Sequence, residues 1–105
     1  MSSITLAGLA CLAGVMGLPA PTVLPTVEVL SFTRVKEICG EKYIGCHRAG
    51  HIIYPEGQIR DTTRPHEMAH YIRWSSKQYL PKWQRENEAR WASRRYHTWC
   101  GEVKD

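Results

Sequence analysis

The first 27 residues of the chain carry no charged side chain, and this limits what the remainder can fold into. An unbroken run of small and apolar residues extends from Ile4 to Leu18, and the proline-rich residues 18–26 predict an extended linker. The folded body is expected to begin near Val27, as one domain of roughly 75 residues. A body of that size gains marginal stability from its core, so a metal ion, disulfides or a partner should add to it.

The apolar segment has three interpretations: a short membrane anchor, an export signal, or a helix buried on the body. From Ile4 to Leu18 a helix would rise only about 22 Å, short of a hydrocarbon core of about 30 Å, and prolines follow. We favour the two membrane-related interpretations, because so small a body can hardly cover such a helix. Residues 1–26 are then an anchor or signal segment that meets a membrane through residues 4–24. The protein is expected to be membrane-anchored or exported, with a cytoplasmic location as the alternative.

The body is basic. The formal net charge is +4, and ten of the fourteen Lys and Arg residues lie from Arg60 onward, interleaved with all four tryptophans. Basic residues among aromatic ones fit nucleic acid or an anionic membrane surface. However, Glu86, Glu88 and Glu102 interrupt the run, and no known nucleic-acid-binding motif is present. We therefore favour a solvated helix surface and do not expect a nucleic-acid partner.

Three cysteines, Cys39, Cys46 and Cys100, belong to the body. In an oxidising compartment a bridge from Cys39 or Cys46 to Cys100 would tie the ends of the body together. In a reducing compartment all three could be small buried hydrophobic residues. No Cys-x-x-Cys pair is present, which argues against a four-thiolate zinc site.

Sequence patterns predict an α+β body. Residues 33–39 suit a short helix that Thr33 caps and Gly40 ends. Two apolar runs, at residues 43–44 and 51–54, flank a turn and predict a strand or small hairpin. Helices are expected over residues 63–74 and 81–99, the first with side-chain oxygens of Asp61, Thr62 or Thr63 as caps and Pro65 in its first turn.

The string His-Glu-Met-Ala-His, residues 66–70, falls in the first of these helices. At about 100° per residue, His66 and His70 lie within about 40° of each other, so both imidazoles can bind one ion. Glu67 lies beside them, where a carboxylate can accept a proton from a metal-activated water. Such a string arises by chance in about 2 % of sequences of this composition, so a third ligand is needed to support it.

Glu88 is the expected third ligand. On the second helix it shares a face with Trp91, Ala92 and Trp99, which should point inward, whereas Glu86 should point outward. An inward carboxylate needs a partner. We favour a metal ion over Arg73 or Arg95. His97 is an alternative to Glu88. We expect His47 and His51 on a turn or at the surface, with a second, weak metal site as the less favoured alternative.

The sequences HEMAH and ENEARWA resemble motifs of the gluzincin zinc metallopeptidases, including small regulatory and phage-borne members. This resemblance implies a minimal zincin-like fold, one Zn²⁺ held by His66, His70 and Glu88, and Glu67 as the general base. It also implies that the strand of Ile52, Ile53 and Tyr54 borders the cleft and pairs with an extended peptide substrate. Tyr96 and His97 are candidates by position to stabilise the oxyanion.

The expected function is zinc-dependent hydrolysis of peptide bonds in a peptide or protein substrate. Zinc would activate the attacking water, and Glu67 would take its proton and pass it to the leaving amine. Two alternatives stay open. One is a zincin-fold binding or regulatory module with little activity. The other is a small basic membrane-associated protein in which the motif is accidental.

Overall fold

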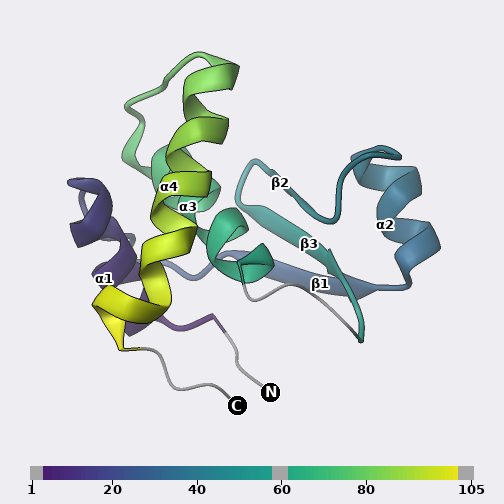
Figure 1. Ribbon diagram of the computed structural model, residues 1–105, viewed down its shortest axis with the longest axis horizontal. Helices are drawn as coiled ribbons and strands as arrows, with labels where there is room; N and C mark the ends of the chain where they lie inside the picture. The colour runs from purple at the N-terminus through teal and green to yellow at the C-terminus, as the bar shows by residue number, and fades with distance from the viewer. Residues whose placement is uncertain (1–3, 58–61, 102–105) are drawn as a thin grey trace.

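The computed structural model describes residues 4–57 and 62–101, which form four helices and a three-stranded sheet (Figure 1). The expected α+β class is confirmed. In chain order the elements are α1 (Leu6–Met16), β1 (Thr26–Leu30), α2 (Phe32–Cys39), β2 (Cys46–Arg48), β3 (His51–Pro55), α3 (Thr63–Ser76) and α4 (Lys82–Cys100).

The sheet has the order β1-β3-β2, with β3 in the centre. β2 and β3 form a hairpin, one of the two forms expected, but its first strand is Cys46–Arg48 and not residues 43–44. Its two-residue turn, Ala49-Gly50, has positive φ angles of 47° and 88°. Two successive positive φ angles are typical of a type I′ turn, whose twist matches that of the strands. β1 pairs with β3 in parallel, Val27 opposite Ile52. This strand was not predicted, because its residues follow the proline-rich segment directly.

The helices lie close to their predicted positions, with different caps. Ser31, not Thr33, caps α2, and its hydroxyl accepts a hydrogen bond from the Arg34 N–H at 3.2 Å. Thr62 stands at the N-cap of α3 without a side-chain cap hydrogen bond. The other cap candidate, Asp61, lies outside the described residues. α4 follows Pro81 and extends one residue beyond the predicted end.

The segment expected to meet a membrane instead contributes to the core. Leu9 and Leu12 of α1 are fully buried, together with Ile72 of α3 and Ala92 of α4. Figure 1 shows α1 beside the C-terminal part of α4. This packing agrees with the interpretation that we did not favour, a helix buried on the body, and the two membrane-related interpretations stay predictions. In the described part of the chain, no helix has the length and apolar character needed to cross a membrane.

The buried face of α4 also differs from the predicted one. Ala89, Ala92, Ser93 and Tyr96 face inward, whereas Trp91 and Trp99 are 40 % and 58 % exposed. The small residues let α4 pack closely against α1 and α3. The tryptophans lie instead around the Arg95 guanidinium, which is 4.3 Å from the Trp91 ring centre. The helix is therefore rotated relative to our expectation, and this rotation decides which glutamate reaches the functional site.

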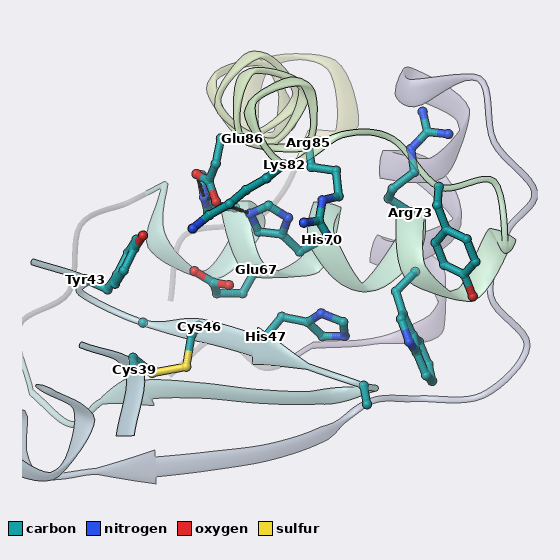
Figure 2. Close-up of a pocket in the computed structure, with 15 residues that line it drawn as sticks. Cys39, Tyr43, Cys46, His47, Glu67, His70, Arg73, Lys82, Arg85 and Glu86 are labelled. Carbon is teal, nitrogen blue, oxygen red and sulfur yellow. Dashed lines mark hydrogen bonds and ion pairs between the residues drawn. A yellow bond between two sulfur atoms is a disulfide. The ribbon is translucent and has the colours of Figure 1, made fainter. Parts of the chain in front are cut away.

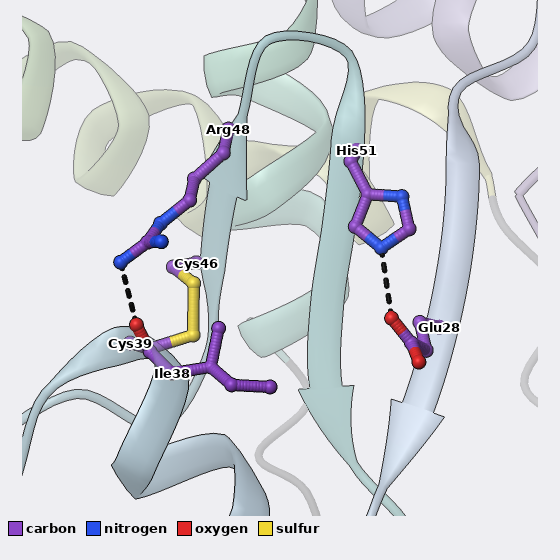
Figure 3. Close-up of a disulfide and its surroundings, with 6 residues drawn as sticks. All are labelled: Glu28, Ile38, Cys39, Cys46, Arg48 and His51. Atoms are coloured by element: carbon purple, nitrogen blue, oxygen red, sulfur yellow. Dashed lines mark hydrogen bonds and ion pairs between the residues drawn. A yellow bond between two sulfur atoms is a disulfide. The ribbon is translucent and has the colours of Figure 1, made fainter.

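Two disulfides connect the elements. Cys39–Cys46 joins the end of α2 to β2, and beside it Arg48 donates a hydrogen bond to the Ile38 carbonyl (Figure 3). Cys11–Cys100 joins α1 to the end of α4. The bridge that we considered for Cys100, to Cys39 or Cys46, was wrong. The partner of Cys100 is Cys11, which we had assigned to the segment outside the body.

Candidate metal centre

His66 and His70 lie about one turn apart on α3 and face the same side, as their spacing predicts. Their Nε2 atoms are 3.2 Å apart, and both rings are half-buried. The opposite side of the helix holds Met68 and Ile72, both nearly inaccessible to solvent. The apolar face thus fixes α3 on the core and leaves the imidazoles facing a cleft.

The third member of the cluster is Glu86 from α4. Its Oε2 is 3.3 Å from His66 Nε2, and its Oε1 is 3.0 Å from His70 Nε2. Figure 2 shows this carboxylate extending from α4 toward α3 and His70. At about 100° per residue, Glu86 lies only about 60° from the buried Ala89, so the close packing of α3 on α4 presents it to the histidines.

These distances fit a small divalent cation. Four ligands at about 2.0–2.1 Å from a tetrahedral zinc ion are separated from one another by about 3.3 Å. The separations between the imidazole nitrogens and the carboxylate oxygens lie at that value or slightly below it. The group of His66, His70 and Glu86 could therefore hold a metal ion, and three protein ligands would leave one position open.

Burial favours the neutral form of both imidazoles. Burial lowers the pKa of His66, an effect that Glu86 partly opposes. Burial also lowers the pKa of His70, and the neighbouring charge of His66 lowers it further. A neutral imidazole has the free nitrogen lone pair that metal binding requires.

Glu67 lies next to the cluster and is 5 % exposed. No described residue forms a hydrogen bond with its Oε1. Burial, together with the charge of Glu86, raises the pKa of Glu67 to about 8. A buried carboxylate without a partner is unfavourable, and a nearby cation would offset that cost. The donor set and this carboxylate therefore both fit a bound cation.

Glu88, the predicted third ligand, has a different partner. Its carboxylate forms a two-bond ion pair with Arg73 of α3, with Arg73 Nε donating to Oε1 at 2.9 Å. We had considered Arg73 as a partner of Glu88 but favoured a metal ion. The assignment of Glu88 to the metal was wrong. The pair connects α3 to α4.

The two candidates for stabilising the oxyanion lie elsewhere. Tyr96 is 4 % exposed and belongs to the core, where its hydroxyl lies against Gly8 of α1. Its neighbour His97 packs edge-on against the Tyr96 ring and is not among the residues that line the cleft. The rotation of α4 that buries Ala89 and Ala92 also places Tyr96 in the core, away from the cluster of His66, His70 and Glu86.

The expected substrate strand is also displaced. Ile52, Ile53 and Tyr54 form β3, which has neighbours on both sides and no free edge. β2 is the edge strand, and Cys46 and His47 line the cleft instead. The suggested pairing of His47 with His51 at a metal is also wrong. Nε2 of His47 accepts a hydrogen bond from Gly50 N–H, and His51 pairs with Glu28 at 3.0 Å (Figure 3).

The cleft beside the cluster has a volume of about 380 Å³. Several of its lining residues were not singled out from the sequence, among them Tyr43, His47, Lys82 and Arg85 (Figure 2). They come from the loop before β2, from β2 and from the first turn of α4. No local spacing links these segments, so only the tertiary contacts could identify them.

No protein-family model, no curated protein and no solved structure matches the chain.

Proposed function

We propose that the chain is a zinc-dependent hydrolase that cleaves peptide bonds, with His66, His70 and Glu86 as ligands and Glu67 as the general base. The observation that carries the proposal is the convergence of three donor groups, at separations near a tetrahedral edge, beside a buried carboxylate with no partner among the described residues. The two histidines on one helix, with a glutamate between them and a carboxylate ligand from a later helix, are similar to the gluzincin arrangement.

Bound zinc supplies a Lewis acid that lowers the pKa of a coordinated water to about 7 and polarises a carbonyl group. The chain supplies the proton transfers. Glu67 receives the proton of the attacking water at its unpartnered oxygen and returns it to the leaving amine. Its low exposure limits the access of bulk water to this exchange.

Peptide substrates are favoured because an edge strand borders the cleft. β2 can extend the sheet by pairing with an extended chain, and Gly45, Cys46 and His47 line the cleft along it. Tyr43 takes the place of Tyr96 and His97 as the candidate donor to the developing oxyanion, because it lines the cleft together with the ligands.

The test compares the wild type with Glu67→Gln and His70→Ala. We expect elemental analysis to find one zinc per chain in the wild type and in Glu67→Gln, and a loss of zinc in His70→Ala. A mixed peptide library should be cleaved only by the zinc-loaded wild type. Hydrolysis by Glu67→Gln would remove this residue as the base, and the absence of zinc from the wild type would remove the site.

A further inference from the structure

The metal ligands stand at the boundary between two hollows of the surface. The first is the cleft of about 380 Å³ described above, and the second, of about 560 Å³, lies toward the C-terminal part of α4. His66, Glu67 and Glu86 line both hollows. A substrate that crosses the metal centre therefore occupies one hollow on each side of the reacting bond.

Both hollows are lined by basic side chains. Lys82 and Arg85 face the first, and Figure 2 shows both extending from α4 into it. Lys42, Arg90 and Arg94 line the second. Within the described residues, Glu67 and Glu86 are the only carboxylates of either hollow.

Of the cations that line the hollows, Arg73 is neutralised by Glu88, whereas those of α4 are not neutralised. Arg34 and Arg73 each form an ion pair with a glutamate. By contrast, the basic residues of α4 that line the hollows are all exposed, and none of them forms an ion pair with a described carboxylate. These residues are Lys82, Arg85, Arg90 and Arg94.

The spacing of these cations matches an extended chain. From Lys82 to Arg94, α4 rises about 18 Å, which is the length of about five residues of a β-strand. Glu86 lies between them, so cations precede and follow the metal ligand along the helix. Two clefts in which positive charges predominate attract and orient negatively charged substrates.

We propose that this cleft selects peptides with acidic side chains on both sides of the scissile bond, which Arg85 binds in one hollow and Arg90 in the other. The inference rests on the proposed peptidase function and adds the substrate class. An acidic peptide is favoured over a nucleic acid because β2 offers a strand edge along the first hollow.

The test starts from a cleaved library peptide, made in two forms that carry Glu or Gln on both sides of the cleaved bond. We expect kcat/KM to be at least about tenfold higher for the Glu form at low ionic strength, and the difference to shrink in salt. Arg85→Gln and Arg90→Gln should each reduce this preference. The matched control is Arg95→Gln on the same helix, whose guanidinium lies against Trp91 and Trp99 and outside both hollows.

A binding measurement separates failure of this inference from failure of the proposed function. Zinc-loaded Glu67→Gln is titrated with two fluorescent peptides of one fixed sequence, chosen without regard to cleavage, that carry either Glu or Gln on both sides of a central bond. A single-stranded oligonucleotide with the same charge as the Glu peptide is titrated in parallel. Preferential binding of the Glu peptide supports the acidic-peptide inference, whether or not any peptide is hydrolysed. The absence of hydrolysis of every peptide would overturn the proposed peptidase function. Equal kcat/KM for both peptides, an equal loss for both in Arg85→Gln, or tighter binding of the oligonucleotide overturns the acidic-peptide inference.

Discussion

Glu86 and Glu88 are two positions apart and belong to different networks. Glu86 contacts His66 and His70, whereas Glu88 is paired with Arg73. Both carboxylates are partly buried, at 30 % and 18 % exposure. Burial alone therefore does not distinguish a candidate metal ligand from a glutamate in a structural ion pair. The residues that each carboxylate contacts make that distinction.

The same substitution at these two positions should give opposite results. We expect Glu86→Gln to weaken zinc binding by at least about 100-fold, because it removes a charged ligand. Glu88→Gln should keep zinc and lower the free energy of unfolding by about 1–3 kcal/mol, because Arg73 loses its charged partner. Competition with a zinc chelator and denaturation in guanidinium chloride measure the two quantities. Zinc loss in Glu88→Gln alone would restore the original assignment.

His47 should make stability depend on pH. Burial is the main cause that lowers its pKa to about 4, and the charges of His70, Arg85 and His51 contribute. The unfolded chain has an ordinary histidine pKa of about 6.5. Between these values the unfolded state binds more protons, so stability is complete above about pH 6.5 and is lost as the pH falls toward about 4.

We expect His47→Gln to remove part of this loss. The comparison requires metal-free protein with intact disulfides, and the free energy of unfolding of both forms measured from pH 4 to 7. His66 and His70 are present in both forms, so the difference isolates His47. Parallel pH profiles for the two proteins would show that His47 is not held neutral.

At the scale of elements, α1 and α4 meet through a glycine. A Cβ added at Gly8 would lie 2.6 Å from the Tyr96 hydroxyl, whereas a Cβ at Gly14 of the same helix meets nothing within 4 Å. The contact explains how so short a helix can lie close to α4 and bury Leu9 and Leu12.

Alanine at these two glycines should therefore have opposite effects. Gly8→Ala forces Tyr96 or α1 to shift and should lower the free energy of unfolding by about 1–3 kcal/mol. Gly14→Ala should raise it by about 0.5–1 kcal/mol, because alanine loses less backbone entropy in a helix. Denaturation in urea measures both variants. A Gly8→Ala protein as stable as Gly14→Ala would argue against the close approach of α1 to Tyr96.

At the scale of the whole molecule, the Cys11–Cys100 disulfide closes nearly the entire chain. Its cysteines are 89 positions apart, whereas those of Cys39–Cys46 are 7 apart. A disulfide stabilises a protein mainly by restricting its unfolded chain, and the effect grows with loop length. The small core therefore has a covalent supplement, which the size of the body led us to expect.

Replacing each pair of cysteines by serine should show this difference. The chain-entropy relation predicts a loss of about 4–5 kcal/mol for Cys11→Ser/Cys100→Ser and about 2–3 kcal/mol for Cys39→Ser/Cys46→Ser. Both are measured by guanidinium chloride denaturation under non-reducing conditions. A larger loss for the short loop would contradict an entropic origin.

The sequence by itself determined the features that depend on neighbours along the chain. The spacing of His66 and His70 placed both rings on one helical face. The apolar run at residues 51–54 predicted β3, although the other strand of the hairpin is Cys46–Arg48 and not residues 43–44. The helix limits near residues 63 and 81 were also close. Each of these follows from helical or strand periodicity and from turn chemistry, which a few consecutive residues fix.

Only the tertiary structure decided the features that depend on how separate elements meet. Whether Glu86 or Glu88 faces the histidines depends on the rotation of α4, which the small residues at its contact with α1 and α3 set. The place of α1 in the core, its disulfide and the edge position of β2 likewise come from contacts between distant segments. A periodic pattern predicts which face of a helix is buried, but it does not predict which element packs against that face. Several elements could bury the same face, and the packing of the whole molecule selects among them.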